Sequence, residues 1–256
     1  MAGGGTLTAA PFYFTVCKLA RRQKMRHKSL TYHNISEKNT MAKPLIQLAL
    51  DSLDYDTTVN LAKIAHRYVD CIEIGTPCVK VNGLALVKDL RARFPTKLIF
   101  ADLKTMDAGY YEAEPFFAAG ADITTVLGTA DLDTIKGVIA VANKYGKKAQ
   151  VDLINVADKA ACAKAAAAAG AHIIGIHTGI DQQIAGQTPF ADLEALLALG
   201  LPVQVSVAGG IKASTVAQVV KAGASIIVVG GAITGAKDPS KAASEIRDLV
   251  DAAAGA

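Results

Sequence analysis

Residues 97–127 read KLIFADLKTMDAGYYEAEPFFAAGADITTVL and contain one complete strand–helix–strand unit. The apolar run at 97–102 predicts a strand, the segment at 109–119 predicts a helix, and the apolar run at 122–127 predicts a second strand. Gly120 stands between the helix and the second strand, where glycine readily takes the left-handed conformation that ends a helix. The stretch therefore predicts two strands that are joined by a helix.

The same unit repeats along the chain from residue 45 onward. The predicted strands are 45–50, 70–74, 97–102, 122–127, 149–154, 172–177, 203–207 and 225–230. The predicted helices are 57–68, 82–93, 109–119, 131–144, 158–169, 190–199, 213–222 and 240–253. Eight such units predict an α/β fold with a single (β/α)₈ TIM barrel. A doubly wound open sheet is the alternative, but no G-x-G-x-x-G motif follows the first strand.

The first 40 residues differ from the rest of the chain in charge. They hold seven Lys or Arg and one acidic residue, whereas residues 41–256 hold 20 basic and 22 acidic residues. We expect residues 1–40 to be a basic leader or extension, disordered or non-native, ahead of a barrel domain at 41–256. A targeting segment is the alternative, because the stretch is rich in Arg. Since the barrel domain is mildly acidic and the chain has no Trp, we predict no nucleic-acid partner.

The composition is that of an ordinary globular protein. Hydrophobic residues make up 51% of the chain and charged residues 20%, which is enough apolar material for one large core. No apolar run reaches the roughly 18 residues of a membrane-spanning helix, so we expect no membrane partner. The cysteines show no C-x-x-C spacing, which indicates free thiols and predicts a cytoplasmic location; they are Cys17, Cys71, Cys78 and Cys162.

Polar residues stand at the ends of the predicted strands, and in a barrel these ends converge on one mouth. Asp51 follows the first strand, Glu73 lies in the second, and Asp102 ends the third. Two buried carboxylates on neighbouring strands are suitable Mg²⁺ ligands, and hydrogen bonding to the backbone or to Lys104 is the alternative. Asp102 and Lys104 lie two positions apart, so we expect both side chains to point into the mouth.

The later strands end in a histidine and in two pairs of glycines. His177 ends the sixth strand, and its place at the mouth favours an acid/base role over a structural one. Gly209 and Gly210 follow the seventh strand, and Gly230 and Gly231 follow the eighth. Glycines there let backbone N–H groups approach an anion, although tight turns would need them too. These residues predict an enzyme for a small phosphorylated substrate, assisted by a divalent cation.

The spacing Asp102-x-Lys104-x-x-Asp107 resembles the D-x-K-x-x-D signature of the orotidine monophosphate decarboxylase superfamily. Within that superfamily, the chain is similar to the 3-hexulose-6-phosphate synthase family over roughly residues 43–255. The segments that carry this likeness are EIGTP at 73–77, ADLKTMDAG at 101–109, TVLG at 125–128, VDLIN at 151–155, HTGIDQQ at 177–183 and VGGAIT at 229–234.

The resemblance implies a Mg²⁺-dependent aldol condensation, with Mn²⁺ as an alternative ion. Formaldehyde would join C1 of D-ribulose 5-phosphate to give D-arabino-hex-3-ulose 6-phosphate through a metal-bound 1,2-enediolate, which is formaldehyde fixation in the ribulose monophosphate pathway. By the same likeness, Glu73 and Asp102 would coordinate the metal and His177 would remove the C1 proton. Lys104 would stabilise the enediolate, and Asp51 would hydrogen-bond substrate hydroxyls.

The resemblance also implies a homodimer with shared active sites, because Asp107 would reach the site of the partner subunit. The substrate phosphate would bind to backbone amides of the strand-end glycines, which are Gly209, Gly210, Gly230 and Gly231.

Two other functions remain open at this point. The related 3-keto-L-gulonate 6-phosphate decarboxylase has an Arg where this chain has Ile180 and another where it has Gly231, and these departures favour the synthase. A non-catalytic barrel that binds a sugar phosphate is the second alternative. It is disfavoured because a mere binder needs no acid/base set such as Lys104, Asp107 and His177.

Overall fold

The computed structural model describes residues 43–255, in which eight parallel strands close into one barrel in sequence order. The strands are β1 (Leu45–Leu50), β2 (Cys71–Ile74), β3 (Leu98–Thr105), β4 (Ile123–Leu127), β5 (Lys148–Asp152), β6 (Ile173–His177), β7 (Gln204–Ala208) and β8 (Ile226–Val229). β1 pairs with β8 as well as with β2, which leaves no free edge in the sheet. The predicted (β/α)₈ TIM barrel is confirmed.

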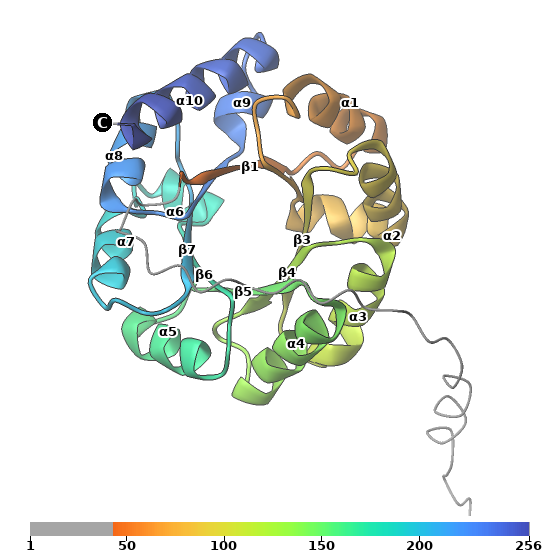
Figure 1. Ribbon diagram of the computed structural model, residues 1–256, viewed down its shortest axis with the longest axis vertical. Helices are drawn as coiled ribbons and strands as arrows, with labels where there is room; N and C mark the ends of the chain where they lie inside the picture. The colour runs from red at the N-terminus through yellow and green to blue at the C-terminus, as the bar shows by residue number, and fades with distance from the viewer. Residues whose placement is uncertain (1–42, 256) are drawn as a thin grey trace, which may run out of the picture. The chain divides into compact units, whose positions relative to one another are not determined.

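Helices surround the barrel, as Figure 1 shows in the view along its axis. They are α1 (Tyr55–Ala65), α2 (Thr76–Arg93), α3 (Gly109–Ala119), α4 (Leu132–Tyr145), α5 (Lys159–Ala168), α6 (Ile180–Ile184), α7 (Phe190–Leu197), α8 (Ala213–Ala222), α9 (Gly231–Thr234) and α10 (Pro239–Ala254). Gly120 ends α3 in the left-handed conformation, as its position in the sequence predicts, and Gly223 ends α8 in the same way. The predicted leader at 1–40 lies outside the described residues.

The interior of the barrel is plugged at one end. Apolar side chains from the first residues of alternate strands pack together there with Phe100. Those residues are Cys71, Ile123, Ile173 and Ile226. Because this layer seals the amino ends of the strands, a cavity inside the barrel opens at the carboxyl ends.

β3 differs from the strand predicted at 97–102, because it continues to Thr105 through a bulge. The register with β4 shifts between Ala101 and Thr105, and Lys104 has a φ of 46°. Simple alternation therefore does not continue through the bulge, but Asp102 and Lys104 both line the mouth of the barrel, as the sequence predicts. A bulge re-aims a side chain, and it is this bulge that turns Lys104 back toward Asp102.

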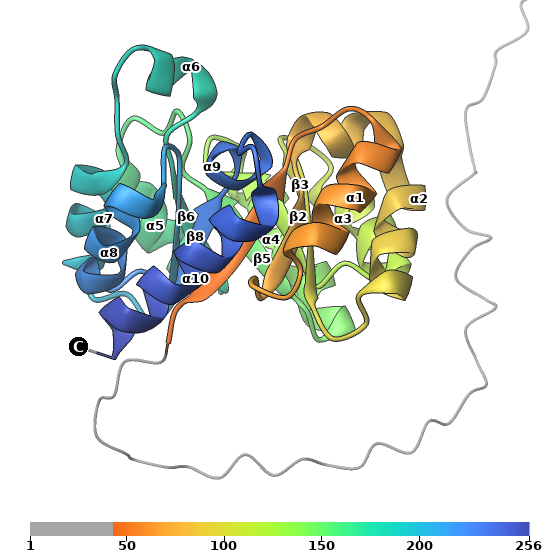
Figure 2. The same ribbon diagram turned by 90° about the horizontal axis from the view of Figure 1, so that it is seen from above.

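The short helices α6 and α9 were not predicted, and both follow strands at the carboxyl end of the barrel. Figure 2 shows α6 projecting beyond that end of the barrel. Among the residues that the structure describes, no helix is long and apolar enough to cross a membrane.

Candidate active site

A cavity of about 720 Å³ occupies the mouth of the barrel and extends into its interior. Nine of the ten residues predicted for the site line it, and they come from the ends of several different strands. They are Asp51, Glu73, Asp102, Lys104, His177, Gly209, Gly210, Gly230 and Gly231. A second hollow of about 710 Å³, between α7 and α8, contains no strand-end residue, so the mouth is the candidate site.

Asp107 is the predicted residue that the structure leaves outside this cavity. It lies exposed in the loop between β3 and α3, and its Oδ1 accepts a hydrogen bond of 2.7 Å from the backbone N–H of Ala108. Within one subunit it makes no hydrogen bond or ion pair with the other predicted residues, and its role across a subunit interface stays a prediction.

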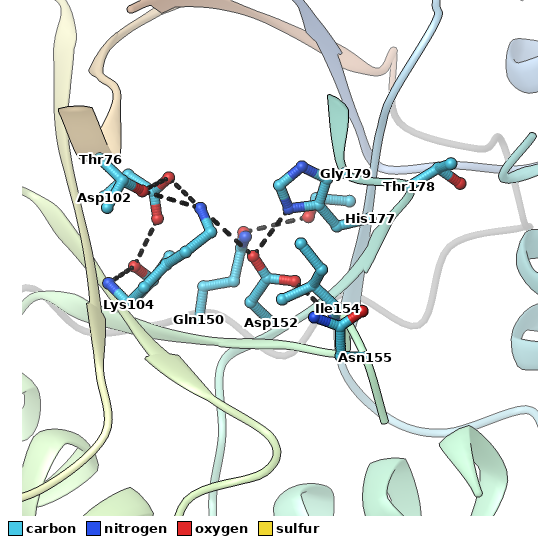
Figure 3. A network of polar contacts seen from close by, with 12 residues as sticks. Thr76, Asp102, Lys104, Gln150, Asp152, Ile154, Asn155, His177, Thr178 and Gly179 are labelled. Carbon is cyan, nitrogen blue, oxygen red and sulfur yellow. Dashed lines mark hydrogen bonds and ion pairs between the residues drawn. The ribbon is translucent and has the colours of Figure 1, made fainter. Parts of the chain in front are cut away.

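Asp102 lies at the left of the polar network in Figure 3, beside Thr76 and Lys104. Its Oδ1 accepts a hydrogen bond of 2.7 Å from Thr125 Oγ1, and its Oδ2 accepts one of 2.6 Å from Thr76 Oγ1. The ammonium of Lys104 also donates to Asp102 Oδ2 and, at 2.9 Å, to Thr76. These contacts hold the carboxylate and the ammonium side by side at the floor of the mouth.

Lys104 lies between two carboxylates, because its Nζ is also 3.6 Å from Asp152 Oδ2. Burial disfavours the ammonium form, but Asp102 and Asp152 together outweigh it and raise the pKa of Lys104 above its ordinary value. The residue therefore stays charged across the physiological pH range and provides a fixed cation in the cavity.

His177 is held by Asp152, a residue of the predicted fifth strand that is not among the predicted site residues. The distance from His177 Nδ1 to Asp152 Oδ2 is 2.9 Å. Burial lowers the pKa of His177, but the bond to Asp152 reverses this and raises it above 6.5. Burial acts to raise the pKa of Asp152, yet the bond to His177 and the charges of His177 and Lys104 lower it overall. In the sequence, Asp152 was marked by its place near a strand end and by the segment VDLIN at 151–155, which carries the family likeness.

Glu73 is a buried carboxylate with a neutral partner. Gln47 Nε2 donates a hydrogen bond of 2.7 Å to Glu73 Oε2. Burial, and then the nearby charge of Asp102, raise the pKa of Glu73 to about 8. Asp51, at the rim, has a raised pKa for the same two reasons, with partial burial first. Four carboxylates line the cavity, and two lysines, Lys104 and Lys212, oppose them.

This donor set fits a divalent cation of the Mg²⁺ type. Glu73 and Asp102 supply hard oxygen atoms, and a cation would relieve the repulsion that raises the pKa of Glu73. Among residues 43–255 no group of three or more His, Cys, Asp or Glu side chains forms a metal cage. Two carboxylates leave room for water and substrate oxygens, which is how Mg²⁺ usually binds.

The glycine pairs form turns on the opposite side of the cavity. Gly209 and Gly210 have φ angles of 107° and 69°, which favour glycine strongly. A Cβ at Gly209 would lie 2.4 Å from the carbonyl oxygen of Thr178, whereas one at Gly231 would meet nothing within 4 Å. Gly209 is thus required by the fold itself, and Gly231 leaves open space at the cavity wall.

We expect Gly209→Ala to lower the free energy of unfolding by about 3 kcal/mol or more, because it adds a clash with backbone to an unfavourable φ. Gly146→Ala is the matched control: φ is 64° there, but a Cβ would meet nothing within 4 Å, so the loss should be about 1–2 kcal/mol. Urea unfolding measures both. Equal losses would show that the contact with Thr178 is unimportant.

The closed barrel and its mouth define a (β/α)₈-barrel enzyme whose cavity holds a network of carboxylates, Lys104 and His177 together with two glycine turns. Residues 44–246 match the model of the Orotidine 5'-phosphate decarboxylase / HUMPS family. The chain is also 67% identical over 205 residues to 3-hexulose-6-phosphate synthase of Methylomonas aminofaciens, which covers 80% of this chain and 98% of the relative. The chain belongs to this family, within it to the group of 3-hexulose-6-phosphate synthases, and it is an aldehyde-lyase.

Solved structures agree with this assignment. A 3-hexulose-6-phosphate synthase from Salmonella typhimurium is 38% identical with a TM-score of 0.80, over 81% of this chain and 99% of that one. A 3-keto-L-gulonate-6-phosphate decarboxylase from Vibrio cholerae is 29% identical with a TM-score of 0.73, over 82% of this chain and 99% of that one. The chain is less similar to this decarboxylase than to the synthase, so the comparison does not favour 3-keto-L-gulonate 6-phosphate decarboxylation as its function. The family resemblance seen in the sequence is therefore confirmed.

Proposed function

We propose that this chain condenses formaldehyde with D-ribulose 5-phosphate to give D-arabino-hex-3-ulose 6-phosphate with Mg²⁺ as cofactor, or with Mn²⁺ in its place. The observation that carries the proposal is one cavity that holds a partly buried Asp102–Lys104–Asp152–His177 network together with two glycine turns. The names of the relatives, which refer to a hexulose 6-phosphate, support a sugar phosphate as the ligand.

The glycine turns would bind the phosphate of the sugar. Gly209 and Gly210 follow β7. Gly230 directly precedes α9, and Gly231 is its first residue. All four glycines line the cavity. Backbone N–H groups that point into such a turn bind a dianion without a charged side chain. Anchoring the phosphate there leaves C1 of the sugar to extend toward the carboxylates and His177.

His177 would remove the C1 proton. Its Nδ1 is bonded to Asp152, so Nε2 is the nitrogen that is left to accept the proton. Asp152 touches no substrate in this scheme and acts as a positioning residue, because its bond selects the tautomer and the ring orientation of His177. The nucleophilic carbon that results attacks the carbon of formaldehyde and forms the new C–C bond.

Lys104 would stabilise the negative charge on the sugar oxygens after proton removal and donate a proton to the new hydroxymethyl oxygen. Both tasks need an ammonium inside the cavity, and Asp102 and Asp152 keep Lys104 in that form. Asp51, at the rim, would hydrogen-bond the sugar hydroxyls. Because the proton taken from C1 is balanced by the proton given to oxygen, the addition releases no by-product.

Glu73 and Asp102 would hold the Mg²⁺ ion. When bound, the ion would draw electron density from the substrate oxygens and make the C1 proton more acidic. The direct test is formaldehyde consumption by the purified protein with ribulose 5-phosphate, with and without EDTA. We expect consumption that needs both the sugar phosphate and the metal. No consumption with metal present would overturn the proposal.

Activity should rise with pH if His177 is the base. The neutral imidazole is the active form, and its pKa lies above 6.5 because Asp152 favours the protonated ring, so kcat/KM should rise through a midpoint above that value. Asp152→Asn removes this effect while burial remains, so the midpoint should move to lower pH. Initial rates across pH measure both curves, and an unchanged midpoint in Asp152→Asn would contradict the assignment.

We also propose that the enzyme is a cytoplasmic homodimer with shared active sites. Large apolar side chains are exposed on the mouth-side rim of the first four strand–helix units, the third of which contains Asp107. They are Leu53, Val81, Met106, Tyr110, Tyr111 and Leu132. A second copy of the chain would bury this rim and bring Asp107 to the neighbouring mouth.

The cytoplasmic location is supported by Cys71, Cys78 and Cys162, which form no disulfide.

Mixing two inactive variants tests the shared site. Asp107→Ala and Asp102→Asn should each be inactive alone, but a heterodimer of the two has one mouth with both residues intact. After dissociation and reassociation of an equimolar mixture, we expect activity to return to roughly a quarter of the wild-type value. Activity measured before and after mixing gives the answer. No recovery in heterodimers that sedimentation shows to have formed would place Asp107 in its own subunit's site.

A further inference from the structure

A layer of polar side chains lies inside the barrel between the mouth and the apolar plug. Two of its members form a matched pair, because Gln47 on β1 and Gln150 on β5 both line the cavity and are 1% and 7% exposed. Their partners differ. Ser206 Oγ donates a hydrogen bond of 3.0 Å to Gln150 Oε1, whereas Gln47 Nε2 donates to the carboxylate of Glu73.

Gln47 is held at one end only. Its Oε1 is buried and has no hydrogen-bond partner among residues 43–255, an arrangement that is unfavourable and therefore uncommon in folded proteins. The contact that fixes the amide is thus the 2.7 Å bond to Glu73 Oε2. The side-chain amide of Gln47 therefore fixes the position of the Glu73 carboxyl group while its own oxygen stays without a partner among residues 43–255.

The bond leaves Glu73 with one oxygen to offer. Within the described part of the chain, Glu73 Oε1 takes no hydrogen bond, while both oxygens of Asp102 accept from Thr76, Lys104 or Thr125. Gln47 is neutral, so it orients Glu73 without bringing a positive charge beside it. A lysine at this position would bring such a charge and compete with a metal ion. The result is a carboxyl group that is fixed in orientation and keeps one oxygen free for a cation.

We propose that Gln47 is a positioning residue for Glu73, which it orients so that the free oxygen is available to a divalent cation in the cavity. This inference rests on the proposed function, since it takes Glu73 as a metal ligand. Gln47 acts through Glu73 and not on the substrate, so its loss weakens metal binding while the chemistry at saturating metal is retained.

The test is a titration of the metal-free protein with Mn²⁺, in which electron paramagnetic resonance measures the free ion. Gln47→Met keeps the length of the side chain and removes the donor, and we expect the Kd for Mn²⁺ to rise by about 10–100-fold. Gln150→Met makes the same change in the same layer without touching a carboxylate, and its Kd should equal that of the wild type. At saturating Mn²⁺, kcat of Gln47→Met should return close to the wild-type value.

Each other outcome has a distinct meaning. Equal Kd values for Gln47→Met and the wild type, or an equal rise in Gln150→Met, would overturn the inference while the proposed function stands. If Glu73→Ala binds Mn²⁺ as tightly as the wild type does, the metal site itself is wrong, and the inference falls with it. Should Gln47→Met fail to fold, as thermal melting would show, Gln47→Asn retains the amide but withdraws it from Glu73, and it should raise Kd in the same way.

Discussion

Replacing Asp102 by asparagine should lower kcat by about 10³–10⁴-fold, the largest effect that we expect from any single substitution. The carboxylate pairs with Lys104 and, in the proposed function, ligates the metal. The substitution weakens both of these contacts, and each of them would stabilise the transition state by several kcal/mol. The asparagine keeps the shape and the contact with Thr125. Steady-state kinetics with formaldehyde and ribulose 5-phosphate measures the effect.

The fold should survive this change. Asparagine removes a negative charge that acts to raise the pKa of Glu73 and Asp51, and Lys104 still faces Asp152 at 3.6 Å. Asp122→Asn is the control, because Asp122 pairs with Arg91 and Lys147 at the sealed end of the barrel. That variant should lose stability and keep its kcat. If Asp102→Asn retained more than about a tenth of the activity, neither role of Asp102 would hold.

Replacing His177 by asparagine should lower kcat by about 10²–10⁴-fold, the usual contribution of a general base. KM for the sugar phosphate should change little, because the glycine turns that would bind the phosphate are separate from the imidazole. Added free imidazole should restore part of the rate by entering the space left by the ring. Initial rates with and without imidazole measure the loss and the rescue.

His172 provides the matched control for this prediction. It lies just before β6, at the other end of the strand that carries His177, and its ring nitrogens contact Ala149 N at 3.2 Å and Asn143 Oδ1 at 3.0 Å. His172→Gln should affect stability and leave kcat unchanged. A similar fall in kcat for both variants would mean that His177 acts through the fold and not as a base.

The barrel was predictable because each of its strands carries a local signal. β1 and α3 have the bounds that the apolar runs and Gly120 predict, since hydrophobic periodicity and helix-ending glycines act over a few residues. α2 was predicted six residues too short, because Gly83, with a φ of 55°, interrupts it and hides the helical turn that starts at Thr76. The five residues of α6 are too few for a periodic pattern.

The site was predictable to the extent that strand order decides it. Once eight strands form a barrel, residues at their carboxyl ends share a mouth, and nine of the ten predicted residues do line one cavity. The contacts of Asp152 with His177 and of Gln47 with Glu73 were not foreseen, because they join residues 25 and 26 positions apart. Their partners depend on the register of neighbouring strands and on side-chain rotamers, which no local pattern encodes.

The sequence by itself determined the class of fold, the family and the set of polar residues at the mouth, since these follow from periodicity, strand order and short motifs. The tertiary structure decided how that set works together. It placed Lys104 between Asp102 and Asp152 through a bulge in β3, and it gave Glu73 a neutral partner and a pKa of about 8. Charge states depend on burial and on distances across the barrel, and those exist only when the sheet has closed.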